Sequence, residues 1–366
     1  MTAFGRLLSS TVRSAAPLAA TLLALCAGAA WPAVDYKIVT ASERGTYIQI
    51  GRDIAKFVAP AAGINLEVLP SVGSAENVQR LRHEPGVKLA IVQSDVYQAF
   101  LDQDAGGNPE AGVLIKPLRV VMPLYNEEIY FIARADSPLN FLHEIKDARI
   151  NVGPVLSGTA MTATTLYRQM FGAPLADAQS SFLPNEDALV KLIGDKSVDV
   201  VAVVAGQPAK LLAEMKPEAK QLVRLLKVDA GNPATKAALQ TYSPATIRSA
   251  SYPNWLEQDV DGLAVKSYLV TYDYTYRATV EHLSQFARSL CQNFAVLQTE
   301  GHPKWRDVRL ALPPLGKGWA YYGPTDRVLR TCSDGAPPPR PANPASRPGE
   351  AACSQQEQIL GLCRPH

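Results

Sequence analysis

The sequence has little net charge and lacks the motifs that most catalytic or cofactor chemistry requires. Its 366 residues include 36 Lys and Arg against 34 Asp and Glu, a formal charge of +2. This near-neutral charge lacks the large positive excess typical of nucleic-acid-binding proteins, so no nucleic-acid partner is expected. No Walker A loop and no G-x-G-x-x-G occurs, so no nucleotide or other cofactor is expected. The five histidines are scattered and no C-x-x-C pair is present, so no metal site is predicted.

Long apolar runs are absent after the first thirty residues. Near the N-terminus two arginines precede "PLAATLLALCAGAA", which ends in a site suited to signal peptidase. We therefore predict a cleaved signal peptide over residues 1–29 and a periplasmic protein. The run is shorter than the ~20 residues that a membrane-spanning helix needs. A lipid anchor at Cys26 is disfavoured because Leu25 precedes it where a small residue is expected. Cleavage removes both arginines and no acid, which brings the formal charge from +2 to zero.

Cysteines are missing from most of the mature sequence. Four remain, all in its last quarter: Cys291, Cys332, Cys353 and Cys363. An oxidising compartment favours disulfides over free thiols. Four cysteines allow three connectivities, of which we predict Cys291 with Cys332 and Cys353 with Cys363. Each bridge would add about 3 kcal/mol by restricting the unfolded chain.

Short apolar runs alternate with helical patterns from Tyr36 onward. Runs such as "YKIVTA", "KLAIVQ" and "VDVVAVVA" are too continuously apolar for strands with one wet face, which predicts an α/β protein with largely parallel sheets. The runs "RVVMPLY" and "IYFIARA" follow each other without a helix, through a polar stretch at 126–128. We place a domain crossing there. The predicted organisation is lobe 1 over 35–125 and 231–332, lobe 2 over 126–230, and a proline-rich linker with a cysteine-containing tail over 333–366.

Three predicted strand-to-helix turns combine glycine with hydroxyl side chains. They are "SERGTY" (42–47), "SVGSAEN" (71–77) and "LSGT" (156–159). Each could simply cap a helix. Each also offers unpaired N–H groups at the positive end of a helix, and glycine lets a ligand approach the backbone. Because ligands of open α/β sheets sit at the carboxyl ends of strands, converging turns would form an anion site.

A catalytic serine is the competing interpretation of Ser157. A nucleophile elbow needs G-x-S-x-G, whereas the local sequence is "VLSGT", and no S-x-x-K occurs. We therefore expect no enzyme, and a serine hydrolase stays an alternative. Charged residues near the turns are few. Arg44 and Asp95 are candidates for the site, while Glu127 and Glu128 read as solvated loop charges.

The ordered motifs "TASERGTYIQIGRDIAKF", "SVGSAENVQRL", "LAIVQSDVYQAF", "LYNEEIYFIARADSPL", "INVGPVLSGTAMTATTLY", "VVAGQP", "VDGLAVKSYLV" and "PPLGKGWAYYGP" resemble the TAXI family, the extracytoplasmic solute-binding proteins of TRAP transporters. The resemblance covers residues 36–330. It implies a type II periplasmic-binding-protein fold, with two α/β lobes joined by a hinge. It also implies capture of a small organic anion, such as an amino or oxo acid, and delivery to a TRAP membrane permease.

The resemblance also implies a set of ligand-lining residues. They are Arg44, Gly45, Thr46, Tyr47, Gly73, Ser74, Asn77, Gln93, Ser94, Asp95, Tyr125, Ser157, Gly158, Thr159, Gly206 and Gln207. The first turn departs from the family pattern, because Arg44 replaces a glycine and Ile48 replaces a tyrosine. A guanidinium there could add an anion-binding point or plug the cleft. A binding protein of the same fold serving a sensor kinase or an ABC transporter is the nearest alternative.

Overall fold

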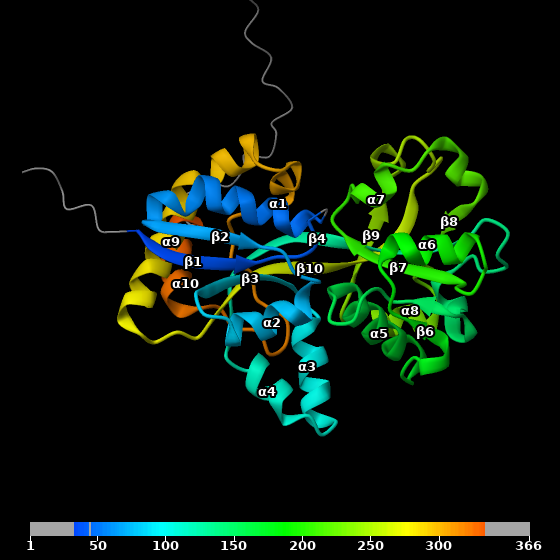
Figure 1. Cartoon of the computed structure of the whole chain (residues 1–366), viewed down its shortest axis with the longest axis horizontal. Helices are drawn as coiled ribbons and strands as arrows, with labels where there is room; N and C mark the ends of the chain where they lie inside the picture. Colours follow the sequence, from blue (N-terminus) through cyan, green and yellow to red (C-terminus); the bar gives the residue numbers. More distant parts are fainter. Residues whose placement is uncertain (1–32, 44, 334–366) are drawn as a thin grey trace, which may run out of the picture.

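The computed structural model describes residues 33–43 and 45–333. The predicted signal peptide, Arg44 and the predicted Cys353–Cys363 bridge lie outside the described residues. Figure 1 shows two lobes side by side, joined by two long strands. The predicted two-lobe α/β fold is confirmed.

Lobe 1 contains a parallel arrangement of three strands, in the order β2-β1-β3. These strands are β1 (Val34–Val39), β2 (Ile64–Leu69) and β3 (Val87–Gln93). Its helices are α1 (Thr46–Asp53), α2 (Ser74–His83), α3 (Val96–Ala105), α4 (Pro109–Ile115), α9 (Arg277–Glu300) and α10 (Gly323–Ser333). Shorter helical turns are η1 (Ile54–Val58), η2 (Pro60–Ala62) and η7 (Pro303–Asp307). Apolar side chains between Tyr47 and Val58 form one stripe along α1 and η1 and pack into the core.

Lobe 2 repeats the strand–helix pattern with shorter strands. They are β5 (Ile150–Asn151), β6 (Ser180–Ser181), β7 (Val200–Ala205), β8 (Val223–Leu225) and β9 (Ser243–Ile247). The helices are α5 (Gly158–Phe171), α6 (Asn185–Ile193), α7 (Lys210–Ala213) and α8 (Pro233–Ala238). Shorter turns are η3 (Leu142–Asp147), η4 (Asp177–Gln179), η5 (Pro217–Gln221) and η6 (Ser249–Ser251).

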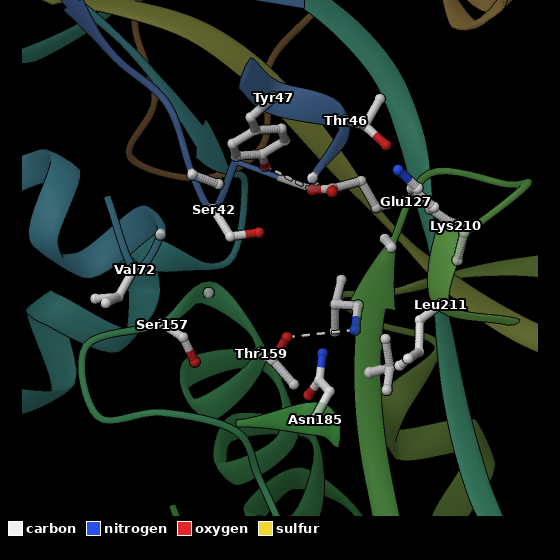
Figure 2. Close-up of a pocket in the computed structure, with 18 of the residues that line it drawn as sticks. Ser42, Thr46, Tyr47, Val72, Glu127, Ser157, Thr159, Asn185, Lys210 and Leu211 are labelled. Carbon is white, nitrogen blue, oxygen red and sulfur yellow. Dashed lines mark hydrogen bonds between the residues drawn. The ribbon is translucent and has the colours of Figure 1, made fainter. Parts of the chain in front are cut away.

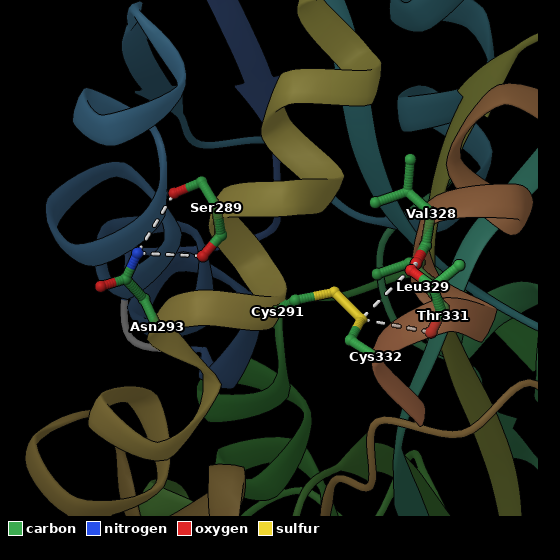
Figure 3. Close-up of a disulfide and its surroundings, with 7 residues drawn as sticks. All are labelled: Ser289, Cys291, Asn293, Val328, Leu329, Thr331 and Cys332. Carbon is green, nitrogen blue, oxygen red and sulfur yellow. Dashed lines mark hydrogen bonds between the residues drawn. A yellow bond between two sulfur atoms is a disulfide. The ribbon is translucent and has the colours of Figure 1, made fainter. Parts of the chain in front are cut away.

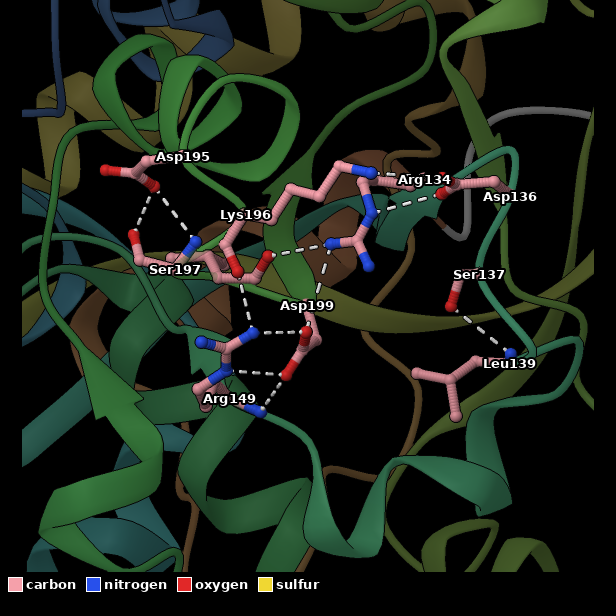
Figure 4. Close-up of polar contacts among 10 residues, drawn as sticks. Arg134, Asp136, Ser137, Leu139, Arg149, Asp195, Lys196, Ser197 and Asp199 are labelled. Atoms are coloured by element: carbon pink, nitrogen blue, oxygen red, sulfur yellow. Dashed lines mark hydrogen bonds and ion pairs between the residues drawn. The ribbon is translucent and has the colours of Figure 1, made fainter.

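A bidentate ion pair joins the residues just before two neighbouring strands of the lobe 2 sheet. Arg149, just before β5, donates from Nε (2.9 Å) and Nη2 (2.7 Å) to the two carboxylate oxygens of Asp199, just before β7. The backbone N–H of Arg149 donates to the same carboxylate at 3.0 Å (Figure 4). These bonds hold the pKa of Asp199 below its usual range. The contact lies directly before the parallel pair β5 and β7, in which Ile150 pairs with Val200.

Two strands run through both lobes, β4 (Leu118–Arg134) and β10 (Val260–Tyr272). They pair antiparallel with each other, and the register shifts near Lys266, which pairs with Asn126. Residues 126–128, where we placed the domain crossing, lie within β4, so the chain passes between the lobes there as one continuous strand. The expectation of largely parallel sheets is wrong for the centre of the molecule. There β3, β10, β4 and β7 are mutually antiparallel neighbours.

The hydrophobic cores show where each lobe ends. Residues up to Tyr125 on β4, and from Tyr268 on β10, pack into the cores of lobe 1. Ile129 and Val265 pack into a core of lobe 2. The predicted return to lobe 1 at residue 231 is wrong: the stretch 232–260 contributes Ala238 and several large aromatic side chains to lobe 2 cores. The return lies near Lys266 instead, because β9 pairs with the lobe 2 half of β10.

The predicted Cys291–Cys332 disulfide is confirmed. It joins α9 to α10, with a Cα–Cα distance of 6.0 Å (Figure 3). Both helices pack on the core of lobe 1. Within residues 33–43 and 45–333, no helix combines the length and apolar character needed to cross a membrane.

Candidate ligand cleft between the lobes

A cavity of about 760 Å³ lies between the two lobes. Lobe 1 contributes the start of α1 at Thr46, the start of α2 at Ser74, and Gln93 at the end of β3. Lobe 2 contributes the start of α5 at Gly158 and the end of β7 (Figure 2). The three turns singled out in the sequence therefore line one cavity. Three helix N-termini face it, and their N–H groups make it favourable for negative charge.

The start of α5 is capped in a way that leaves donors for a ligand. Ser157 Oγ accepts the N–H of Ala160 at 3.0 Å. Thr159 Oγ1 accepts the N–H of Val204 on β7 at 3.3 Å (Figure 2). No protein acceptor within the described residues takes the backbone N–H groups of Gly158 and Thr159. The capping role expected for Ser157 is confirmed, and these two N–H groups are open to an anion.

Glycines allow the two lobes to touch beside the cavity. A Cβ on Gly158 would lie 2.0 Å from Gln93 Oε1 and 2.9 Å from Ser74 Oγ, both in lobe 1. A Cβ on Gly73 would lie 2.7 Å from the nitrogen of Gly158, and Gly73 also has a φ of 136°. The lobes exchange a backbone hydrogen bond here, from Glu76 N to Leu156 O at 3.3 Å. Side chains at these glycines would hold the lobes apart.

A buried carboxyl group forms part of the cavity wall. Glu127 is 4% exposed and accepts the Tyr47 hydroxyl at 2.5 Å (Figure 2). Burial raises the pKa of Glu127 to about 7, against the opposing effect of the Tyr47 hydrogen bond, and the neighbouring Glu128 raises it further. Glu128 is also buried, on the other side of β4. The expectation that both were solvated loop charges is wrong, because the stretch is a strand between two lobes.

Asp95 joins the lobes outside the cavity. It follows β3 in lobe 1 and is 2% exposed. Its Oδ2 accepts the hydroxyls of Thr162 at 2.7 Å and Tyr242 at 3.0 Å, both from lobe 2. Burial raises the pKa of Asp95 to about 6, although both hydroxyls oppose the shift. The side chain is placed to stabilise contact between the lobes and does not line the cavity.

The predicted ligand-lining residues divide into two groups. Those that line the cavity are Gly45, Thr46, Tyr47, Gly73, Ser74, Gln93, Ser157, Gly158 and Thr159. Those that do not line it are Asn77, Ser94, Asp95, Tyr125, Gly206 and Gln207. In the second group Gln207 lines a different cavity, and others make contacts within the protein. Asn77 Nδ2, for example, donates to the carbonyls of Thr40 and Ile91 at the ends of two strands.

Several cavity residues were not singled out from the sequence. Asn185 begins α6, Lys210 begins α7, and His302 precedes η7. The first two follow strands of lobe 2, as the recognised turns do. The stretches "LPNED" and "GQPAK" therefore carried the same strand-to-helix signal, without its glycine–hydroxyl pattern.

The described residues give Ser157 the contacts of a capping residue. Its hydroxyl oxygen accepts the Ala160 N–H, and no histidine of the described segments hydrogen-bonds to it. His302 lines the same cavity, but its Nδ1 accepts the N–H of Lys304. The same segments contain no group of three His, Cys, Asp or Glu side chains placed to hold a metal ion.

The protein has two α/β lobes, two strands that pass from one lobe to the other, and a cavity between the lobes. This architecture is that of a type II periplasmic-binding-protein fold. The chain belongs to the NMT1-like family, whose sequence profile matches residues 38–302.

Solved structures with a similar fold include XAC2383 from Xanthomonas citri bound to ATP, which is 14% identical, with a TM-score of 0.44 over 83% of this chain and 97% of the other. BugD, a periplasmic binding protein, is 14% identical, with a TM-score of 0.45 over 83% and 95%. A putative sulfonate-binding protein from Methylobacillus flagellatus is 9% identical, with a TM-score of 0.45 over 82% and 77%.

Proposed function

We propose that this protein is a periplasmic solute-binding receptor. It captures a small organic anion, a carboxylate such as an amino or oxo acid, and delivers it to a TRAP-type membrane transporter. The observation that carries the proposal is the meeting of three helix N-termini, those of α1, α2 and α5, at one cavity between the lobes. Membership in the NMT1-like family agrees with solute binding, and the ordered motifs shared with the TAXI family favour the TRAP system.

The proposed binding groups are the helix N-termini and the hydroxyls around them. The N–H groups of Gly158 and Thr159 would donate to the anion from lobe 2, and Ser74 and Thr46 would meet it from lobe 1. The carboxyl of Glu127 does not oppose this role below pH 7, because a pKa of about 7 leaves most of it protonated there. The predicted role of Arg44 as a further anion contact belongs to this proposal.

The proposed mechanism is hinge closure about β4 and β10. A ligand that contacts helix N-termini of both lobes binds the closed arrangement more tightly than the open one, and therefore shifts the population toward closure. Gly73 and Gly158 let the lobes approach, and Asp95 would hold them together through Thr162 and Tyr242. The transporter would then recognise the closed form.

A thermal-shift screen of amino acids, oxo acids and dicarboxylates, followed by calorimetry, tests the proposal. We expect at least one organic anion to raise the melting temperature. Thr159→Ala should then weaken its binding by about 1 kcal/mol. Absence of binding across the whole panel would count against the proposal. If Ser157→Ala abolished turnover of an ester while leaving its binding intact, a hydrolase would replace the receptor.

A further inference from the structure

A second cavity, of about 350 Å³, lies beside the two long strands β4 and β10 where they pass between the lobes. Asn126 and Glu128 of β4 line it, whereas Glu127 between them lines the first cavity. Because successive side chains of a strand point to opposite faces, the two cavities lie on opposite sides of β4. They have no lining residue in common. The volume falls within the range of about 300–1,000 Å³ typical of small-ligand pockets.

Positive charge is in excess around this second cavity. Arg248, Lys266 and Lys304 line it, against Glu128 and Asp307. Lys304 is 5% exposed and already neutralised: its Nζ lies 2.9 Å from Asp307 Oδ2 and 3.8 Å from Glu128 Oε2. The side chains of Arg248 and Lys266 make no hydrogen bond or ion pair with any residue the structure describes.

The surroundings of the two unpaired cations are consistent with a missing counter-charge. Burial lowers the pKa of Lys266, and the positive charge of Lys304 lowers it further, although Asp307 partly compensates. Arg248 is exposed, and its charge contributes to lowering the pKa of Asp259. The Asp259 carboxylate accepts hydrogen bonds from the N–H and the hydroxyl of Ser249 instead. An anion in the cavity would favour the charged form of Lys266 and pair with both cations.

We propose that this cavity is a second binding site, for a small dianion with carboxylate or phosphate oxygens. The Arg248 guanidinium and the Lys266 ammonium donate to the anion, and the exposed Asn126 amide adds a neutral donor at the cavity wall. The site is separate from the proposed solute cleft and does not depend on which solute the cleft binds.

The position of the cavity links it to hinge motion. Arg248 follows β9 of lobe 2, while Lys304 and Asp307 lie on η7, which packs against α9 of lobe 1. Lys266 of β10 pairs with Asn126 of β4 where the two strands pass between the lobes. Rotation of the lobes about this crossing changes the distance between Arg248 and η7. An anion held there favours one lobe separation, and by linkage it changes the affinity of the cleft for its own ligand.

Calorimetric titration of the mature protein with inorganic phosphate and with succinate, separately, tests the site and tells which oxygen-bearing anion it takes. We expect at least one of them to bind, with its affinity reduced about tenfold by Lys266→Gln and by Arg248→Gln. Lys210→Gln removes a matched lysine from the first cavity and should leave this affinity unchanged. Absence of binding for both anions, or unchanged affinity in both Lys266→Gln and Arg248→Gln, would overturn the proposal.

Two further comparisons separate this site from the cleft and from misfolding. If Lys210→Gln alone weakens binding, the anion occupies the first cavity and the second site is refuted. Arg248 is exposed, so Arg248→Gln keeps the core intact even if Lys266→Gln does not fold. Arg248→Lys should recover part of the lost affinity. If the cleft binds organic acids normally in Lys266→Gln and Arg248→Gln, the receptor proposal holds, whatever the result for the second site.

Discussion

Tyr47 donates its hydroxyl to Glu127 across 2.5 Å, joining the first turn of α1 to the strand that crosses between the lobes. The contact places a carboxyl with a pKa of about 7 in the wall of the proposed anion cleft. Whether that carboxyl is protonated decides the charge that an incoming anion meets.

Glu127 should make anion binding depend on pH. Because the pKa is raised, the carboxyl is neutral below about pH 7 and repels an anion above it. Affinity should therefore fall as the pH rises from 6 to 8, by at most about tenfold per pH unit, since one proton is linked to binding. In Glu127→Gln the same titration should be flat across this range. Calorimetry at several pH values provides the measurement, and an equal slope in both proteins would remove Glu127 from the cleft's electrostatics.

Glu127 should also make the free energy of unfolding depend on pH. The folded protein holds this proton up to about pH 7, whereas the unfolded chain releases it near 4.5. The folded state therefore binds more protons between these values, and the stability contribution of this group is lost as the pH rises through them. Urea unfolding of the wild type and Glu127→Gln at pH 5 and pH 8 checks the sign: the variant should gain relative stability at the higher pH. A relative loss there would contradict the assignment.

Gly158→Ala should weaken ligand binding by blocking contact between the lobes. The added Cβ would meet Gln93 and Ser74 at less than contact distance, so the closed arrangement would have to open. Gly316→Ala is the matched control, because nothing lies within 4 Å of its Cβ position. We expect about a tenfold or greater loss of affinity for Gly158→Ala and none for Gly316→Ala. Equal affinities would show that closure does not require this contact.

Tyr242→Phe should loosen the contact between the lobes. Asp95 would keep its buried charge but lose one of two hydroxyl donors, which costs about 1.5–3 kcal/mol for a bond to a charged group. Because the pKa of Asp95 is about 6, the loss should shrink at pH 5, where the carboxyl is protonated. Tyr276→Phe, at a tyrosine that is 74% exposed, serves as the control. Denaturant unfolding at pH 5 and pH 8 measures both variants, and identical losses at the two values would exclude a role for the Asp95 charge.

Loss of the Cys291–Cys332 disulfide should destabilise lobe 1. The bridge closes a loop with a sequence separation of 41 residues, for which restriction of the unfolded chain is worth about 4 kcal/mol. A Cys291→Ala, Cys332→Ala double variant should melt at a lower temperature than the wild type, while retaining ligand binding in the distant cleft. An unchanged melting temperature would show that packing of α9 against α10 suffices alone.

Local patterns predicted the local features of the site. The turns at 42–47, 71–77 and 156–159 combine glycine with capping hydroxyls, and they line one cavity because each follows a strand. The sequence also predicts a long helix from about 276 to 299, and α9 runs from Arg277 to Glu300. Such signals depend on residues close in sequence, which is why they could be read without the structure.

The burial of the stretch that crosses between the lobes could not be predicted in the same way. The stretch 126–128 is polar, and polarity usually indicates a loop; here the strand passes between two lobes, so Glu127 and Glu128 are buried by residues distant in sequence. The return to lobe 1 was predicted at residue 231 rather than near Lys266 for a related reason. Ala238 packs against lobe 2, but nothing in its local pattern tells which lobe it joins.

If an anion closes the two lobes about β4 and β10, the protein becomes more compact when the anion binds. Small-angle X-ray scattering with and without the anion found by screening tests this closure most directly. We predict that the anion reduces the radius of gyration of the wild type and of Gly316→Ala, and leaves Gly158→Ala extended. An unchanged radius of gyration in the wild type at saturating ligand would contradict hinge closure.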